Sequence, residues 1–225
     1  WVVSPCPFMG HALATRHPDL RRPNHRHRVA ATEGLQMATD DLEERAGLPD
    51  ALRVLLEKYP RENWASRTPM GGLSQFWLER HLMFRKLLTQ LGDDGRTLVD
   101  AGMAPEAYAE RLSRFGGFLI GQLHEHHHVE DAHYFPLLAA REPRLAAGFA
   151  LLDRDHVALD GHLSTFAADA NALLAALQSG DASGGQDGRL IATLERLERF
   201  LDRHLTDEEE LVIPVLLEHG EGTLG

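Results

Sequence analysis

Apolar and polar positions follow a helical period along most of the chain. Apolar residues recur every three or four positions in four long stretches, and this spacing is typical of amphipathic helices. These stretches cover about 73–91, 105–138, 143–177 and 190–217. The turn residues GDDG at 92–95 predict the end of the first helix, and SGDASGGQDG at 179–188 predicts a flexible loop before the fourth.

The pattern predicts an all-α protein, because no alternating run of β-branched residues is long enough for a sheet. Four amphipathic helices with mostly short connections favour an antiparallel up-down four-helix bundle. Pro105 suits the first turn of the second helix. Pro136 and Pro214 stand near the ends of the second and fourth helices, where each predicts a kink or a late break.

The first third of the chain has a different pattern. Residues 1–30 are rich in Pro, Arg and His without a clean period, and they predict an extended basic arm that either lies on the acidic body or forms a mobile tail. Residues 31–60 predict one or two short helices, with Pro49 opening the second and Pro60 ending it, and 61–72 read as a linker. We therefore expect an N-terminal helical and extended extension, 1–72, before a bundle domain, 73–220.

Composition narrows the classes of function. The formal net charge of the 225 residues is −11, which argues against nucleic acid or an anionic membrane as a partner. No apolar run reaches the roughly 18–20 residues that a membrane span needs. A single cysteine, Cys6, excludes an intrachain disulfide and leaves zinc-finger and iron–sulfur sites without ligands. These features predict a cytoplasmic protein.

Histidines are concentrated in the second predicted helix. The stretch HEHHHVEDAHYFPLL at 124–138 holds five of the fourteen histidines of the chain. At about 100° per residue, His126 lies on the apolar side of this helix with Glu130 one turn further on. The same projection, centred on His126, turns His124, His127 and His128 away, so we expect these three at the surface.

The fourth helix repeats the same motif. His204, Glu208 and Pro214 have the spacing of His126, Glu130 and Pro136, and both helices read H-x3-E-x5-P. A His and a Glu four positions apart leave one face of a helix about 6 Å apart, so they can reach the same metal ions. Two copies on different helices predict one shared site.

The other two helices each offer one inward-facing histidine on an apolar background. The predicted ligand set is His81, His126, Glu130, His156, His204 and Glu208. These nitrogen and oxygen donors suit iron, with manganese or zinc as alternatives, and no thiolate is present to favour copper(I).

Further donors and a rival architecture stay open at this point. Asp160 stands four positions after His156, where an additional ligand could reach the site, and His133 is a candidate for an extra ligand or a supporting group. Glu130-x-x-His133 also matches the ferritin-like Glu-x-x-His motif once. Position 211, where a second copy would need its histidine, is Leu, so the ferritin-like alternative ranks second.

These motifs resemble the hemerythrin-like, or HHE cation-binding, family over about residues 73–218. The resemblance implies a four-helix bundle around a non-haem di-iron centre with two bridging carboxylates, and it implies the same six ligands. Oxygen-carrying members have a fifth histidine where Asp160 stands here. The ligand set is thus most similar to the branch that repairs iron centres after nitric-oxide stress, although that branch usually has an N-terminal cysteine pair and this chain has only Cys6.

The resemblance implies a protein that binds O2 or NO at the metal for storage, transport or sensing. The alternative is a di-iron redox enzyme that acts on NO, peroxide or damaged iron–sulfur clusters, and a second alternative is an iron sensor. The sequence leaves open whether the chain is an enzyme.

Overall fold

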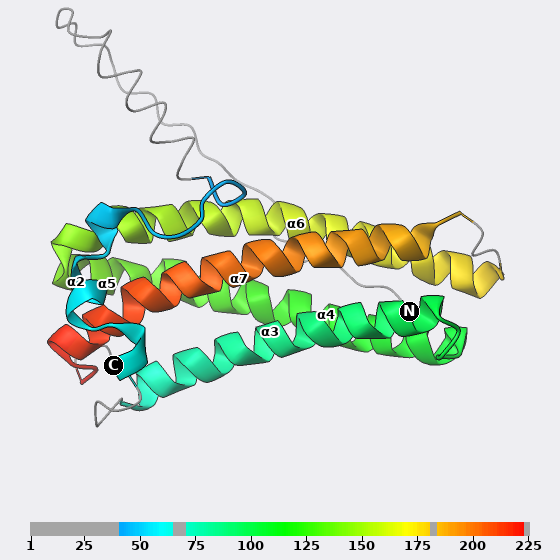
Figure 1. Cartoon of the computed structure of the whole chain (residues 1–225), viewed down its shortest axis with the longest axis horizontal. Coiled ribbons are helices and arrows are strands. Elements are labelled where there is room, and N and C mark those ends of the chain that lie inside the picture. The colour runs from blue at the N-terminus through cyan, green and yellow to red at the C-terminus, as the bar shows by residue number, and fades with distance from the viewer. Residues whose placement is uncertain (1–40, 65–70, 181–183, 223–225) are drawn as a thin grey trace, which may run out of the picture.

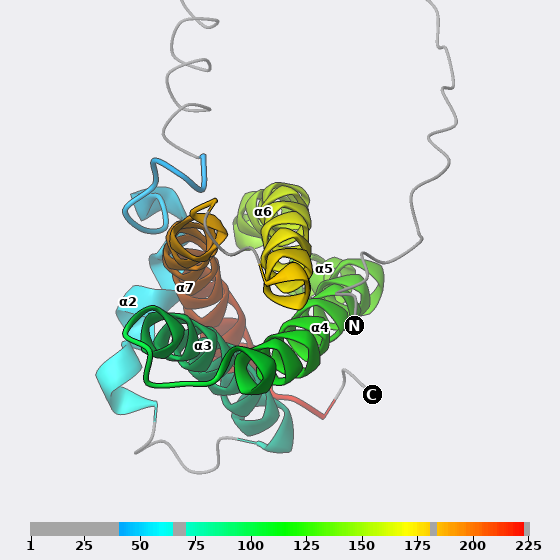
Figure 2. The same ribbon diagram turned by 90° about the vertical axis from the view of Figure 1, so that its right-hand side faces the viewer.

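The computed structural model describes residues 41–64, 71–180 and 184–222, and all regular secondary structure in these ranges is helical. The long helices lie side by side, and each contacts two neighbours, as the end-on view shows (Figures 1 and 2). No helix in the described ranges combines the length and apolarity needed to cross a membrane. The long segments are α3 (Gly72–Val99), α4 (Pro105–Val129) with its continuation α5 (Phe135–Arg141), α6 (Ala146–Ser179) and α7 (Gln186–His219).

Short helices precede the bundle. They are η1 (Asp50–Leu52), α2 (Val54–Lys58) and η2 (Arg61–Asn63), and α2 packs against α7. As predicted, a short helix begins directly after Pro49 and Pro60 follows a helix end, but the single helix predicted between these prolines is two, η1 and α2. The predicted arm at residues 1–30 lies outside the described residues.

The core has two apolar clusters separated by a polar layer. One cluster includes Phe84, Leu119 and Phe166, and the other includes Phe135 and Leu152. Along each long helix, the residues of one cluster end and those of the other begin near the predicted metal ligands. The predicted ligands of all four helices therefore lie at the same height in the bundle. The flanking pairs are Trp77 and Phe84, Leu123 and Phe135, Leu152 and Leu159, and Leu205 and Leu211.

The prediction that the first helix ends near Leu91 is wrong, because α3 continues through GDDG to Val99. Asp94 is buried and accepts hydrogen bonds from Arg111 of α4 at 2.7 and 2.9 Å. Gly95 lets α7 approach closely, since a Cβ there would lie 3.2 Å from the side chain of Ile191. These tertiary contacts outweigh the local preference of glycine and aspartate for a turn.

The second long segment changes its winding before Pro136. A π-helical turn, η3 (Glu130–Tyr134), links α4 to α5, and the backbone N–H of Phe135 bonds to the carbonyl oxygen of Glu130. In a regular α-helix the Pro136 ring would clash with the carbonyl group four residues earlier. The wider π-helical turn includes the residue whose carbonyl group would clash with the ring. The helical segment can therefore continue past Pro136 to Arg141. In α7, Pro214 is likewise inside a helix that continues to His219.

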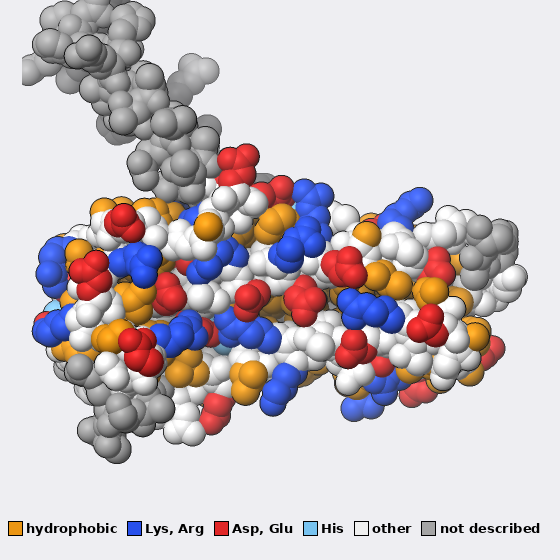
Figure 3. Space-filling model, viewed as in Figure 1, with side chains coloured by type: hydrophobic (Ala, Val, Ile, Leu, Met, Phe, Trp, Pro, Cys, Tyr) orange, Lys and Arg blue, Asp and Glu red, His pale blue; other side chains and the backbone are white. Residues whose placement is uncertain are grey.

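The surface carries charges of both signs. On the face drawn in Figure 3, basic and acidic side chains are interspersed over the helices. Ion pairs such as Arg85–Asp202, at 2.7 Å, and Arg96–Glu195, at 3.4 Å, join α3 to α7. Exposed pairs of this kind contribute little each, so the buried clusters supply most of the stability of the bundle.

Candidate metal centre

All six residues predicted as ligands lie in the polar layer. His81, His204 and Glu208 are fully buried, and Glu130 and His156 are buried as well. The side chain of His126 is 10% exposed, which is the largest exposed fraction among the six. The six residues come from α3, from α4 and the π-helical turn η3, from α6 and from α7, so all the long segments contribute to one site.

Glu130 is the first residue of the π-helical turn. Its Oε1 lies 3.0 Å from Nε2 of His126, and its Oε2 lies 3.6 Å from Nε2 of His156. The two oxygens of this carboxylate therefore face histidines on two different helices.

Glu208 has the same arrangement on the opposite side of the layer. Its Oε1 lies 3.3 Å from Nε2 of His81, and its Oε2 lies 3.4 Å from Nε2 of His204. The indole N–H of Trp77 also donates to Oε1 and fixes the carboxylate. His81 and His126 bring their Nε2 atoms within 3.1 Å of each other. The six side chains thus converge on one small volume.

Several polar atoms in this volume have no hydrogen-bond partner. They are both carboxylate oxygens of Glu130, Oε2 of Glu208, and Nε2 of His156 and His204. A buried polar group without a partner costs about 1–3 kcal/mol. Five such atoms around one point are unusual for a packed core. Bound cations would satisfy all five, so the residues present fit a metal centre.

Carboxylates outside the layer orient three of the histidines. In each case a carboxylate oxygen faces Nδ1, which leaves Nε2 directed at the centre, and this arrangement is common around metal-binding histidines. The pairs are His81 with Glu209 at 3.0 Å, His156 with Asp131 at 2.8 Å, and His204 with Asp155 at 3.4 Å.

Two arginines from the segment before the bundle hold these outer carboxylates. Arg45 is buried, donates to Asp155, and donates from Nε to Asp207 at 2.8 Å. Arg61 donates to Glu209 at 2.6 Å. The segment 41–64, to which the sequence assigned no role, therefore supports two of the predicted ligands.

The electrostatics of the layer favour a cation. Burial and the neighbouring Glu208 raise the pKa of Glu130 well above its usual value. Burial lowers the pKa of His126 to about 3. Burial also lowers the pKa of His204, but hydrogen bonds with Asp155 and Glu208 outweigh it and raise the pKa to about 9. A divalent ion would relieve the repulsion between the two carboxylates and replace the proton on His204.

The expectation that His127 lies at the surface is wrong: its side chain is buried beside His156 and His204. The apolar stripe of α4, which includes Leu119 and Leu123, is centred about 50° from His126, towards His127, at 100° per residue. The two histidines therefore lie on either side of the stripe. A projection centred on the stripe, rather than on His126, would have found His127.

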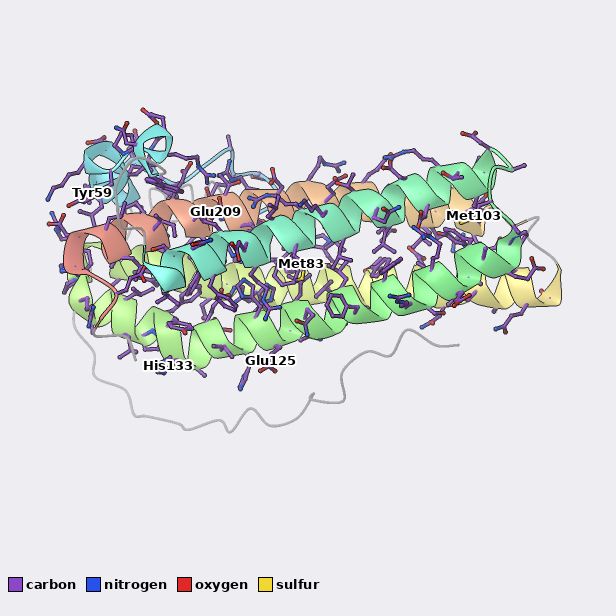
Figure 4. All side chains as sticks on the ribbon, turned by 90° about the horizontal axis from the view of Figure 1, so that it is seen from below. Tyr59, Met83, Met103, Glu125, His133 and Glu209 are labelled. Carbon is purple, nitrogen blue, oxygen red and sulfur yellow. The ribbon has the colours of Figure 1, made fainter. Side chains whose placement is uncertain are left out.

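The other candidate donors lie outside the centre. His133 is exposed, so the single Glu-x-x-His match does not bring a histidine into the layer. Asp160 is also largely exposed, and its carboxylate lies 3.4 Å from Nε2 of His124. Figure 4 shows Glu125 and His133 on the outer side of the helical segment that carries them.

A cavity of about 180 Å³ between α3 and the α4 segment reaches the polar layer. His126 and Glu130 form its inner wall. Its other lining residues are Phe76, Trp77, Arg80, Glu125, Val129 and Tyr134. A larger cavity of about 790 Å³ lies between α6, α7 and Asp41, and it contains none of the six residues. The smaller cavity therefore gives access to the centre.

Fold and site together define a class: a helical bundle with a buried histidine and carboxylate layer that could hold metal ions. The family model of the hemerythrin HHE cation binding domain matches residues 73–216, and the chain belongs to this family. No curated protein and no solved structure matches the chain. The matched region begins within the first turn of α3, so Arg45 and Arg61 precede it.

Proposed function

We propose that this chain binds O2 or NO at a carboxylate-bridged di-iron centre, for storage, transport or sensing, within an antiparallel up-down four-helix bundle. The metal ligands in this proposal are His81, His126, Glu130, His156, His204 and Glu208. One observation carries the proposal: the two oxygens of Glu130 face different histidines, and so do those of Glu208. A carboxylate that bridges two metal ions needs this arrangement.

The number of donors, taken together with the proposed binding of a small ligand at the metal, favours iron over zinc. If both carboxylates bridge, each ion receives two histidines and two carboxylate oxygens. Four donors would complete the tetrahedral shell that zinc prefers in structural sites. An ion that prefers six ligands would keep open positions, and iron bound here would supply reversible redox and small-ligand chemistry. Manganese remains the alternative with similar donor preferences.

The cavity supports a small ligand. Its volume of about 180 Å³ is below the roughly 300–1,000 Å³ of pockets that hold drug-sized molecules. Phe76, Val129 and Tyr134 give part of its wall an apolar character, which suits uncharged diatomic molecules. His126 and Glu130 at its inner wall place the proposed metals at the end of this path.

Optical spectra of the iron-loaded, reduced protein test the proposal. A carrier or sensor should give a spectrum with O2 or NO that reverses when the gas is removed. Unchanged spectra with both gases, in protein that contains iron, would show that small-ligand binding is not the function.

A redox enzyme acting on NO or peroxide is the second candidate. Trp77 donates to Glu208, and its ring lies 5.1 Å from that of Tyr134, so two oxidisable side chains connect the centre to the cavity. The cavity is too small for a protein-bound iron–sulfur cluster, which favours NO or peroxide as substrate within this candidate. Sustained consumption of either molecule by catalytic amounts of protein would favour the enzyme.

A further inference from the structure

The larger cavity, between α6, α7 and the start of the segment 41–64, lies outside the polar layer. Its volume of about 790 Å³ falls within the roughly 300–1,000 Å³ of pockets that hold small molecules. Small residues widen it, since Ala158 and Gly161 line it from α6 and Ala192 lines it from α7. Beyond its chain neighbours and its own helix backbone, a Cβ at Gly161 would meet no atom within 4 Å. The cavity therefore has open space for a ligand.

The α7 wall of this cavity is positively charged. Arg189, Arg196 and Arg199 line it, whereas the carboxylates in the lining are Asp41 and Glu43. Among the described residues, only Arg196 of the three arginines has a carboxylate partner, which is Glu43. The side chain of Arg199 donates instead to a backbone carbonyl oxygen of its own helix, at 3.3 Å. The wall thus has cationic groups available for an anion from outside, in a chain whose net charge is −11.

Glu43 shows how this wall binds an anion. Nη2 of Arg196 donates to both of its carboxylate oxygens, at 3.2 and 3.0 Å, and Nε2 of His162 lies 3.3 Å from its Oε1. The guanidinium of Arg196 lies 5.6 Å from the ring centroid of Phe200, and the ring of His162 lies 4.6 Å from the same ring. Phe200 therefore holds the two donors in place. The Glu43 side chain is 42% exposed, and exposed ion pairs are weak, so a ligand anion can replace it.

The spacing of the arginines indicates the kind of anion. Arg189 and Arg196 are seven residues apart, which is two turns and about 10 Å along α7. They therefore share one face of the helix, with Arg199 close to Arg196. A guanidinium group binds phosphate through two parallel hydrogen bonds. A molecule with one phosphate near each end of this face would use the cations best. The acidic chain as a whole disfavours nucleic acid, which favours a small molecule.

We propose that the larger cavity binds a small molecule with two phosphate groups. Arg196 and Arg199 bind one phosphate, which displaces Glu43, and Arg189 binds the other. None of the six proposed metal ligands lines this cavity, so the site is independent of the metal centre. Its success or failure in experiment leaves the proposed function unchanged.

Calorimetric titration of the full chain with fructose 1,6-bisphosphate tests the proposal, and fructose 6-phosphate is the comparison with one phosphate. Arg196→Met removes a cation from the cavity. Its matched control is Arg114→Met, because Arg114 is an exposed arginine of α4 that lies 5.2 Å from the ring of Phe115. Gly161→Leu fills the cavity and keeps every charge. Its control is Gly121→Leu, an exposed position on α4 that also has open space beside it.

We expect the wild type and both controls to bind the bisphosphate with a dissociation constant below about 1 mM. The monophosphate should bind at least about tenfold more weakly. Arg196→Met and Gly161→Leu should each weaken bisphosphate binding by at least about tenfold. Glu43→Gln should tighten it, because the competing carboxylate is removed. Leucine is a better helix former than glycine, so an unchanged or higher melting temperature of Gly161→Leu separates lost binding from unfolding.

Three results would overturn the proposal. Equal affinity in the wild type, Arg196→Met and Gly161→Leu would mean that the bisphosphate binds elsewhere on the chain, the metal centre included. Equal affinity for the two sugar phosphates would refute the assignment of two phosphate positions. A dissociation constant of the wild type above about 1 mM would mean that the cavity is not a site for this class of ligand.

Discussion

At the scale of single residues, substitution of a bridging glutamate should remove more bound metal than substitution of a histidine. Glu130 and Glu208 each face two histidines, so Glu130→Ala or Glu208→Ala should disturb both metal positions. His81→Ala should disturb mainly one. We expect iron per chain to fall from about two to below one in the glutamate variants and to about one in His81→Ala.

Elemental analysis of the purified variants measures this difference, with His128→Ala as the exposed control. Equal and mild losses from all three site variants would contradict the bridging arrangement.

His204 gives the centre a specific pH dependence. Its pKa is about 9, above the ordinary value of 6.5, so the metal-free protein keeps a proton there at neutral pH. That proton stabilises the metal-free fold fully below the unfolded pKa, and its contribution is lost as the pH rises through about 9. Metal must displace it, so apparent affinity should rise by at least about tenfold per pH unit up to about pH 9, and more steeply where the raised pKa values of His81 and Glu130 leave further protons to displace.

Competition between Mn²⁺ and a chelator at several values between pH 6 and 9 measures this dependence without iron oxidation. An affinity that is constant above pH 7 would contradict the proton displacement at His204.

The sequence identified most of the polar layer but not its surroundings. A repeated H-x3-E spacing on two helices was enough to select the four residues that the structure places together. His127 was missed because the helical projection was centred on His126, about 50° away from the centre of the apolar stripe. The outer carboxylates Glu209, Asp131 and Asp155 were missed because their contacts depend on how neighbouring helices approach each other, which periodicity does not describe.

At the scale of elements, the segment 41–64 should stabilise the bundle through Arg45. Removing this cation in Arg45→Met leaves Asp155 and Asp207 buried without it, and breaking a buried ion pair typically costs about 3–5 kcal/mol. It also frees the carboxylate that faces Nδ1 of His204, so iron should be released faster.

Urea unfolding and chelator-driven iron release check both effects. Arg53→Met is the control, because Arg53 is an exposed arginine just before α2. If Arg45→Met and Arg53→Met unfold at the same urea concentration, the segment does not support the centre.

Helix boundaries could be predicted from the sequence where a proline marks them. They could not be predicted where contacts between helices determine how far a helix extends. Pro105 begins α4 as predicted. GDDG reads as a turn locally, yet Arg111 and the close approach of Ile191 keep it helical. The π-helical turn at Glu130 has only Pro136 as a sequence signal, and a proline alone does not distinguish a kink from a change of winding.

At the scale of the whole molecule, metal bound in the polar layer between the two apolar clusters should increase the free energy of unfolding. A metal present at about 100 times its dissociation constant adds about 2.7 kcal/mol. For a protein of this length that corresponds to roughly 5–11 °C in the melting temperature. Calorimetry with and without a chelator at pH 7 should show this shift in the wild type and in His128→Ala, and lose it in the double variant Glu130→Ala, Glu208→Ala. Identical melting of loaded and chelated wild type would mean that the layer holds no metal.

The most direct test of the central claim is a count of iron together with its magnetism. The claim is that one buried layer holds two irons joined by Glu130 and Glu208. We predict about two irons per chain after loading. In the oxidised protein we predict antiferromagnetic coupling, seen as a diamagnetic Mössbauer spectrum at low temperature and no signal from isolated high-spin iron in electron paramagnetic resonance. One iron per chain, or two irons with the resonance of uncoupled ions, would contradict the claim.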